Sequence, residues 1–193
     1  MNVAIIPARG GSRRIPGKNK KDFHGRPIIC YSIDAAKESG LFHDVIVSTD
    51  DDDIKEIALN MGVGVQERVP DMARDEVGTQ EVAGHALSML RFAGSDPQYA
   101  CVIYATAPMI SVGDLVYGLQ LLEAGDFHYV YSVGPMMADA GQWYWGKTLS
   151  FVRGVSLSHE KTSKVKISNR RVCDINNPID WKRAEIMYAR LTR

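Results

Sequence analysis

The sequence VAIIPARGGSRRIPGKN occupies residues 3–19 and joins an apolar run to a loop rich in glycine and basic side chains. Residues 3–8 are apolar and rich in branched side chains, which predicts a buried strand. Six basic residues follow between Arg9 and Lys21, and the first acidic side chain is Asp22. Glycine lets a backbone approach a ligand closely, and guanidinium and ammonium groups match phosphate oxygens. This loop therefore predicts a polyphosphate site.

Two better-known phosphate-binding patterns do not fit the loop. A P-loop requires G-x-x-x-x-G-K-[ST], but Ser12 stands five residues before Gly17, and Asn19 follows the lysine. The G-x-G-x-x-G pattern of dinucleotide-binding folds is also missing from this stretch. A solvated basic loop without a ligand is the remaining alternative, and composition alone leaves it open.

Short β-rich runs alternate with helical patterns through the first two thirds of the chain. The segments expected as strands are 3–8, 45–49, 63–67, 99–104 and 129–133, and the expected helices are 28–39, 52–61, 79–92 and 111–123. This alternation predicts an α/β fold of Rossmann-like, three-layer type, with a mostly parallel sheet between helices. Ligands of such sheets bind at the carboxyl ends of the strands, so the loops after Ala8, Thr49 and Tyr104 are the first candidates.

The pattern becomes less regular after residue 133, where short strands are expected at 143–145 and 165–167. A final helix is predicted by Asn177 at its cap, Pro178 at its first position and Asp180 in its first turn. Ser111 and Asp114 predict a capping box at the start of the helix 111–123. Residues 1–193 contain no linker or repeat, so a single domain is expected.

Composition narrows the class of protein. The chain has 193 residues, 45% of them hydrophobic, and its formal net charge is zero. Nucleic-acid and membrane-surface proteins usually carry a basic excess, so neither partner is expected. Cys30, Cys101 and Cys173 are widely spaced among apolar neighbours, which indicates buried thiols in a reducing compartment. No apolar run reaches membrane-spanning length, and a cytoplasmic location is expected.

Residues 8–19, ARGGSRRIPGKN, closely resemble the A-R-G-G-S-K-x-I-P-x-K-N signature of acylneuraminate cytidylyltransferases. The resemblance continues in VSTDD at 47–51, YATAP at 104–108, DAGQWYWG at 139–146 and VCDIN at 172–176. It therefore spans nearly the whole chain. The YATAP and DAGQWYWG variants are most similar to the pseudaminic acid cytidylyltransferase branch of the family.

The resemblance implies a nucleotide-diphospho-sugar transferase fold and a reaction. CMP passes from CTP to a nine-carbon keto-acid sugar (a nonulosonic acid), pyrophosphate is released, and Mg²⁺ is the cofactor. Attack of the sugar hydroxyl on the α-phosphorus builds charge on phosphate oxygens, which fixed cations and a metal stabilise. The catalytic contacts to the triphosphate are then Arg9, Arg13 and Lys18. The implied nucleotide-binding residues are Gly10, Gly11, Ser12, Asn19, Arg68 and Thr79, and the implied sugar-binding residues are Tyr104, Thr106, Gln142 and Tyr144.

The resemblance assigns the metal to Asp174 and Asn176, where the family normally has two aspartates. In an extended stretch, residues two apart face the same way, so Ile175 would face the core. The amide oxygen of Asn176 can still coordinate a metal, but it brings no charge, and magnesium often takes only one or two carboxylates. A simple turn into the last helix is an alternative, and both roles can hold together.

Other acidic and imidazole side chains point to structure rather than chemistry. The acidic run 50–53 precedes a predicted helix, where capping and the helix dipole favour negative charge. The five histidines (His24, His43, His85, His128 and His159) show no metal-ligand spacing. Surface or loop roles are expected for them.

Between Val133 and Asp139 the chain is shorter than the family it resembles. Family members carry an extra segment there that helps form a homodimer and contributes sugar contacts to the partner's site. A homodimer is implied by the resemblance, and the shortening leaves it open.

Three functions remain to be separated. The first is a cytidylyltransferase for pseudaminic acid, and the second is the same reaction on N-acetylneuraminate, legionaminate or another keto-acid sugar. The third is a CTP-binding protein that has lost catalysis, which the residue at 176 and the shortened segment favour. Function resides in the site rather than in the fold, so the geometry of these residues matters most.

Overall fold

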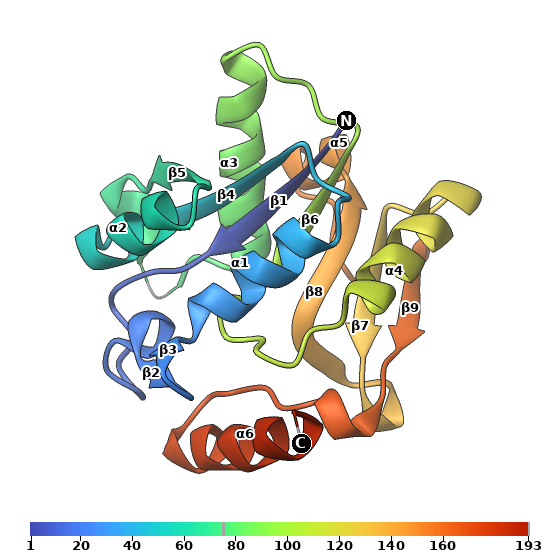
Figure 1. The fold of residues 1–193 in the computed structure, drawn as a ribbon. Coiled ribbons are helices and arrows are strands. Elements are labelled where there is room, and N and C mark those ends of the chain that lie inside the picture. The colour runs from blue at the N-terminus through green and yellow to red at the C-terminus, as the bar shows by residue number, and fades with distance from the viewer. Residues whose placement is uncertain (75, 193) are drawn as a thin grey trace.

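A seven-stranded sheet forms the centre of the protein, and the computed structural model describes residues 1–74 and 76–192 (Figure 1). The strands lie in the order β5-β4-β1-β6-β8-β7-β9. Their bounds are Asn2–Pro7 (β1), Asp44–Thr49 (β4), Gly64–Glu67 (β5), Tyr99–Ile103 (β6), Tyr129–Val133 (β7), Asp139–Lys147 (β8) and Thr162–Lys166 (β9). Only β8 runs antiparallel to its neighbours β6 and β7. The predicted α/β fold with a mostly parallel sheet is confirmed.

Helices cover both faces of the sheet. The covering helices are Ile29–Glu38 (α1), Asp52–Asn60 (α2), Thr79–Phe92 (α3), Val112–Ala124 (α4) and Thr148–Val152 (α5), and a sixth helix, Pro178–Leu191 (α6), lies beyond one edge. One core cluster joins α1, α2 and α4 to one face, and a second joins α3 and α5 to the other. Side chains of β1 alternate between these clusters, because neighbouring residues of a strand point to opposite faces. The result is three layers, as predicted.

A third apolar cluster lies beyond the carboxyl edge of the sheet. It packs α6, through Trp181, against Ile15 and Phe23 of the segment after β1 and against Ile175. That segment contains a short turn of 3-10 helix (Lys18–Lys20) and a small hairpin made of Asp22–Phe23 (β2) and Arg26–Pro27 (β3). Figure 1 shows the hairpin and α6 next to each other below the sheet. The segment after β1 and the last helix thus meet at the edge where ligands are expected.

The two predicted helix caps have different outcomes. At α6 the Asn177 cap is confirmed, and the structure adds a full capping box: Asn177 Oδ1 accepts from the backbone of Ile179 and Asp180, and Asp180 Oδ2 accepts from Asn177 N at 3.1 Å. At α4 the prediction was wrong, since the Ser111 side chain makes no capping bond. Asp114 instead forms an ion pair with Arg171 at 2.8 Å.

The structure confirms the expected state of the cysteines and contains elements that the sequence did not predict. Cys30, Cys101 and Cys173 are free and buried, as expected. The strand expected at 143–145 is the centre of the longer β8, and β2, β3 and α5 were not anticipated. Within the described part of the chain, every helix is too short or too polar to cross a membrane.

The capping difference is testable. Asn177→Ala removes two acceptor contacts at the start of α6 and should lower the free energy of unfolding by about 1 kcal/mol. Ser111→Ala is the matched control, because that serine also occupies an N-cap position but makes no side-chain bond there. Urea unfolding measures both. Equal losses in the two variants would contradict the assignment.

Candidate active site

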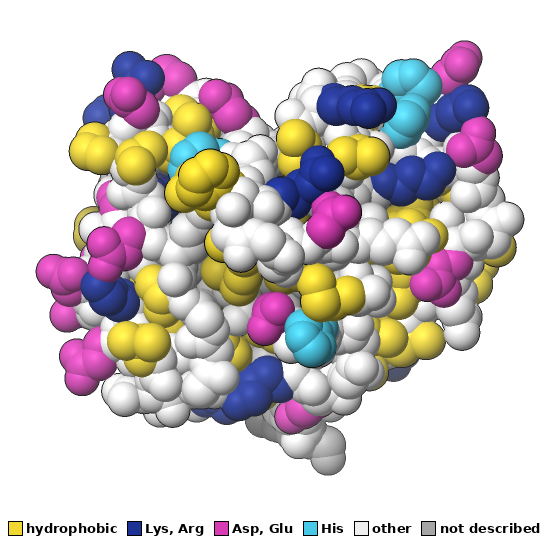
Figure 2. All heavy atoms as spheres, turned by 90° about the horizontal axis from the view of Figure 1, so that it is seen from above, with side chains coloured by type: hydrophobic (Ala, Val, Ile, Leu, Met, Phe, Trp, Pro, Cys, Tyr) yellow, Lys and Arg dark blue, Asp and Glu magenta, His cyan; other side chains and the backbone are white. Residues whose placement is uncertain are grey.

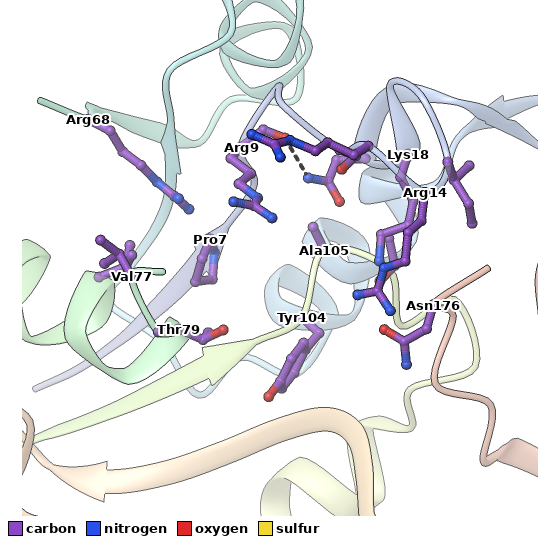
Figure 3. Close-up of a pocket in the computed structure, with 17 residues that line it drawn as sticks. Pro7, Arg9, Arg14, Lys18, Arg68, Val77, Thr79, Tyr104, Ala105 and Asn176 are labelled. Carbon is purple, nitrogen blue, oxygen red and sulfur yellow. Dashed lines mark hydrogen bonds between the residues drawn. The ribbon is translucent and has the colours of Figure 1, made fainter. Parts of the chain in front are cut away.

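A cavity of about 310 Å³ opens at the carboxyl edge of β1 and β6 (Figure 3). Its walls come from the loop after β1, the start of α3, the end of β5 and the loop after β6. Ten of the residues proposed from sequence line it: Arg9, Ser12, Arg13, Lys18, Asn19, Arg68, Thr79, Tyr104, Thr106 and Asn176. The structure therefore gathers into one place residues that are spread over most of the chain.

Positive charge is concentrated in this cavity. Among the described lining residues, every charged side chain is basic: Arg9, Arg13, Arg14, Lys18 and Arg68. The opposite end of the sheet, seen from above in Figure 2, carries Lys, Arg, His and acidic side chains intermixed. There Lys147 and Lys161 both pair with Asp126. A neutral chain thus places a local cationic field at the carboxyl edge, which suits a polyanion.

Lys18 connects the two distant motifs. Its Nζ donates a hydrogen bond to the Ile175 carbonyl oxygen at 2.7 Å, across 157 positions of sequence. Burial lowers the pKa of the Lys18 ammonium, and the nearby charge of Asp174 opposes that shift. The ammonium therefore lies between the basic loop and the proposed metal residues.

Arg68 enters the cavity from the end of β5. Its Nε donates to the backbone oxygen and to the hydroxyl of Ser48, both at 3.1 Å, which fixes the base of the guanidinium on β4. Burial lowers the pKa of Arg68 to about 10, with the charge of Asp50 opposing the shift, so the group remains cationic at neutral pH. Figure 3 shows the side chain extended along one wall of the cavity.

Gly10 has a role different from the one that its sequence context indicates. Its backbone N–H donates to Asp50 Oδ1 at 2.9 Å, and a Cβ at this position would lie 2.7 Å from Asp51 Oδ2. The close approach that requires glycine is therefore made to the turn after β4. Gly11 has open space around its Cα, and neither glycine lines the cavity.

Asn19 is buried at the inner side of the same loop. Its Nδ2 donates to the backbone oxygen of Arg9 at 2.9 Å, which closes the loop on itself. Asn19 also lines the cavity, so one side chain can hold the loop and face a ligand. The adjacent Gly17 has a φ of 61°, a conformation that glycine adopts without strain.

Asp174 and Asn176 face the same way, as their spacing predicts. Asn176 Nδ2 donates to Asp174 Oδ2 at 2.5 Å, while Ile175 between them is fully buried. Gly141 lies against this pair with a φ of 63°, and a Cβ there would be 3.0 Å from Asp174 Cγ. Only a glycine lets β8 approach the carboxylate so closely.

Asp139 is an acidic neighbour of this pair that the sequence interpretation did not single out. Its Oδ1 accepts from Gly141 N at 2.8 Å. Burial raises the pKa of the Asp139 carboxyl, and the charge of Asp174 adds to the shift. Its position in the DAGQWYWG motif was a signal, but no spacing rule linked it to Asp174. Arg14 was also missed as a lining residue, although its charge in the basic loop could have indicated it.

The described residues include no group of three or more His, Cys, Asp and Glu side chains arranged to hold a metal ion. Two of the histidines lie far from the cavity: the rings of His128 and His159 meet edge to face, with 4.7 Å between centroids, at the opposite end of the sheet. A metal at Asp174 and Asn176 would accordingly need oxygens from a ligand as well as from the protein.

The four proposed sugar-binding residues fall into two groups. Tyr104 and Thr106 line the cavity, but Gln142 and Tyr144 are buried in β8 and do not. The Tyr144 ring lies behind Tyr104, with 6.1 Å between ring centroids. Its hydroxyl has no hydrogen-bond partner among the described residues, and burial raises its pKa. Gln142 Nε2 donates to the Arg171 carbonyl oxygen at 2.5 Å.

A protein family described as cytidylyltransferase matches residues 3–152, which run from β1 to the end of α5. The chain belongs to the cytidylyltransferase family. It is accordingly a nucleotidyltransferase by family, and the match includes the basic loop, Arg68 and the start of α3.

Individual relatives agree with the family. This cytidylyltransferase is 30% identical to the pseudaminic acid cytidylyltransferase of Campylobacter jejuni, over 97% of this chain and 96% of the relative. It is 37% identical to the N-acylneuraminate cytidylyltransferase of Streptococcus agalactiae, over 72% of this chain and 33% of that protein. A solved CMP:2-keto-3-deoxy-manno-octonic acid synthetase in complex with CTP has the same fold, with a TM-score of 0.75 and 15% identity. That likeness covers 98% of this chain and 99% of the other.

The lowered pKa of Lys18 gives the cytidylyltransferase a testable pH dependence. Only the cationic ammonium attracts phosphate, so CTP binding should weaken as pH rises through a pKa below the usual 10.5. Above that pKa the dissociation constant should rise up to about tenfold per pH unit. Titration calorimetry from neutral pH up to the usual lysine pKa of 10.5 measures it. Lys18→Arg, which stays charged, should flatten the profile, and an identical slope in both proteins would contradict the assignment.

Proposed function

We propose that this cytidylyltransferase transfers CMP from CTP to pseudaminic acid and releases pyrophosphate. The observation that carries the proposal is the bond from Lys18 Nζ to the Ile175 carbonyl, which joins the basic loop to Asp174 and Asn176. Family membership and the relative aligned over nearly the whole chain support the reaction class and the sugar. Buried free thiols fit a reducing compartment, so the cytoplasm is the proposed location.

The triphosphate of CTP is the proposed occupant of the basic cavity. Arg9, Arg13 and Lys18 contact its phosphate oxygens, with Arg68 and Thr79 on the facing wall beside the nucleoside. Guanidinium groups bind phosphate through paired hydrogen bonds, and the ammonium acts as a point charge. Ser12, Gly10, Gly11 and Asn19 complete the proposed nucleotide site, the glycines through the backbone conformation of the loop.

The proposed reaction needs no protein nucleophile. The anomeric hydroxyl of the sugar loses its proton to solvent as its oxygen forms a bond to the α-phosphorus, and the bond from this phosphorus to the oxygen that bridges to the β-phosphate breaks. Negative charge grows on oxygens of the α-phosphate and of the departing pyrophosphate. Arg9, Arg13 and Lys18 are fixed cations beside this charge, and preorganised charge of this kind lowers the barrier.

Magnesium fits the donors at residues 174 and 176. A carboxylate and an amide oxygen on one side of an extended segment are hard ligands, and Mg²⁺ completes its shell with phosphate oxygens and water. In the proposed site Asp174 and Asn176 hold the ion, with the Asp139 carboxylate nearby. When bound, the ion neutralises charge on the phosphates.

Tyr104 and Thr106 are the proposed contacts to the sugar, because they line the cavity beside the nucleotide region. Gln142 and Tyr144 lie behind these two residues and would support that wall of the cavity. The unpaired Tyr144 hydroxyl and Gln142 Oε1 leave hydrogen-bonding capacity next to this wall. A buried polar group without a partner costs about 1–3 kcal/mol, so a shift of Tyr104 that admits a sugar hydroxyl would recover part of that energy.

A second sugar class has its own support. The N-acylneuraminate cytidylyltransferase relative shares more identity over its shorter match, so transfer to N-acetylneuraminate, legionaminate or another keto-acid is the alternative. A third possibility, CTP binding without turnover, is favoured by the neutral side chain at Asn176 and by the shortened segment between Val133 and Asp139. The homodimer that the resemblance implies remains a proposal. The alignment with the Campylobacter relative spans 222 positions, more than the 193 residues of this chain.

A panel assay separates these functions. Purified protein, CTP, Mg²⁺ and each of several nonulosonic acids are mixed, and pyrophosphate release is followed. Turnover with pseudaminic acid is the expected result, at a kcat of about 1–100 per second. Turnover only with a different keto-acid would replace the sugar assignment. CTP binding by calorimetry without turnover on any sugar would overturn the catalytic proposal.

The metal assignment has a separate test. Asn176→Asp adds a carboxylate at the proposed site and should lower the half-saturating Mg²⁺ concentration on the order of tenfold. Asn177→Asp is the matched control, because it adds the same charge one residue away, at the start of α6. Binding of Mn²⁺ followed by electron paramagnetic resonance gives a second readout without turnover. An unchanged metal requirement in Asn176→Asp places this residue away from the metal.

A further inference from the structure

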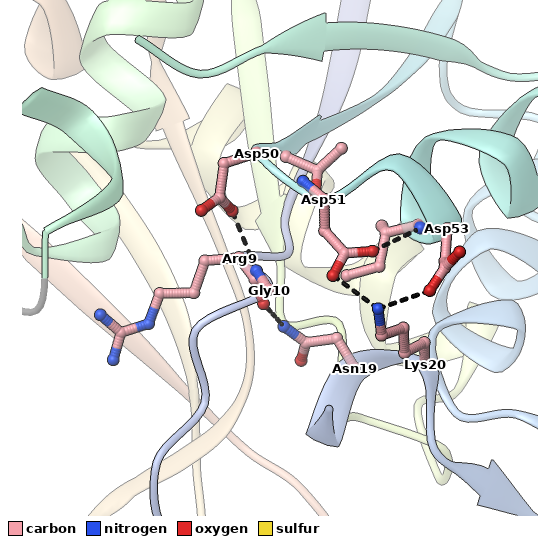
Figure 4. Close-up of polar contacts among 9 residues, drawn as sticks. Arg9, Gly10, Asn19, Lys20, Asp50, Asp51 and Asp53 are labelled. Carbon is pink, nitrogen blue, oxygen red and sulfur yellow. Dashed lines mark hydrogen bonds and ion pairs between the residues drawn. The ribbon is translucent and has the colours of Figure 1, made fainter. Parts of the chain in front are cut away.

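The turn after β4 holds the basic loop from the side opposite the cavity (Figure 4). Asp50 Oδ1 accepts from Gly10 N at 2.9 Å. Lys20 Nζ donates to Asp51 Oδ2 at 2.6 Å and to Asp53 Oδ2 at 2.7 Å. Two points of the loop, ten residues apart, are therefore attached to one acidic turn, and neither attachment uses a group that lines the cavity.

The two attachments differ in what they do. Asp51 is already committed to structure, since its Oδ1 accepts from Ile54 N at 3.0 Å and caps α2. Among the described residues Asp50 makes no capping bond to α2, and its Oδ1 accepts instead from the backbone of the loop. Asp50 thus binds the backbone directly next to Arg9.

Arg9 and Gly10 are adjacent, so the direction of the Gly10 amide constrains the Arg9 backbone from which its side chain extends. The Arg9 carbonyl on the other side accepts from Asn19 Nδ2 at 2.9 Å. The peptide unit between Arg9 and Gly10 is consequently held at both its oxygen and its nitrogen. A peptide plane is rigid, so two hydrogen bonds of this kind fix its orientation.

Charge gives a reason for a carboxylate at this point. The cavity holds five basic side chains, which repel one another when no polyanion is bound. The charge of Asp50 acts on Arg68, where it opposes the effect of Arg9. Asp50 lies outside the described cavity lining, so it offsets this repulsion without occupying the place of the phosphates.

We propose that Asp50 is a positioning residue for nucleotide binding: by holding the Gly10 amide it sets the Arg9 side chain before CTP arrives. This inference rests on the proposed function. Preorganisation of this kind raises affinity because the loop loses less conformational freedom on binding.

Three variants test the inference. Asp50→Ala removes the acceptor, and the dissociation constant for CTP should rise about tenfold, the size expected for losing a hydrogen bond to a charged acceptor. Asp50→Asn keeps an acceptor oxygen for the Gly10 amide and should stay within about threefold of the natural protein. Asp52→Ala is the matched control, since it removes an acidic side chain of the same turn and leaves the Gly10 amide its acceptor.

Amide hydrogen exchange supplies a readout that does not depend on activity. Exchange in residues 9–12 should speed up in Asp50→Ala, while residues 52–60 of α2 keep their natural rate. Unchanged exchange and CTP affinity in Asp50→Ala would overturn the inference. Equal losses in the Ala and Asn variants would also overturn it, because charge rather than the hydrogen bond would then be responsible. If the natural protein itself fails to bind CTP, the proposed function fails instead.

Discussion

The contact from Lys18 Nζ to the Ile175 carbonyl determines how the site is assembled. A buried ammonium loses hydration, and that loss is tolerated only where good acceptors and negative charge are close. The carbonyl and the nearby Asp174 supply both. The same region is held by apolar packing of Ile15 and Trp181 in the cluster beyond the sheet edge. Hydrophobic burial brings the segment after β1 and the C-terminal segment together, and the ammonium then fixes how they face each other.

The local field of the cavity depends on where the acidic groups lie. The sequence is neutral overall, yet the charged side chains described along the cavity wall are basic. Asp50 and Asp51 stand behind the loop, and Asp174 stands at its far end beside Lys18. Opposite charges in these positions limit repulsion among the cations without closing the space between them. Net charge alone therefore carries little information about such a site, because the separation of charge in space decides what binds.

Much of the fold could be predicted because it rests on local rules. The alternation of strand-like and helix-like segments predicted the parallel sheet, and the Asn177 cap of α6 follows from its side-chain chemistry. The cap at Ser111 failed for a reason no local rule contains: Asp114 is engaged by Arg171, which comes from a distant segment. The contact that requires a glycine at position 10 could not be predicted for the same reason, since its close neighbour Asp51 belongs to another strand connection. Local chemistry is read from sequence, whereas competition between partners depends on the tertiary structure.

The connection between β7 and β8 limits where sugar contacts can come from. It consists of residues 134–138, and Met136 and Met137 adopt φ values of 55° and 62°. Such left-handed backbone costs roughly 1–2 kcal/mol per residue for side chains of this kind. The connection is therefore a strained turn and not an extended segment. Gly134 is pressed against Val172, where a Cβ would lie 2.8 Å from Cγ1. None of residues 134–138 belongs to the described lining of the cavity. In the proposed reaction, selection of the sugar therefore falls on groups already at the cavity, Tyr104 foremost, with the start of β8 behind it.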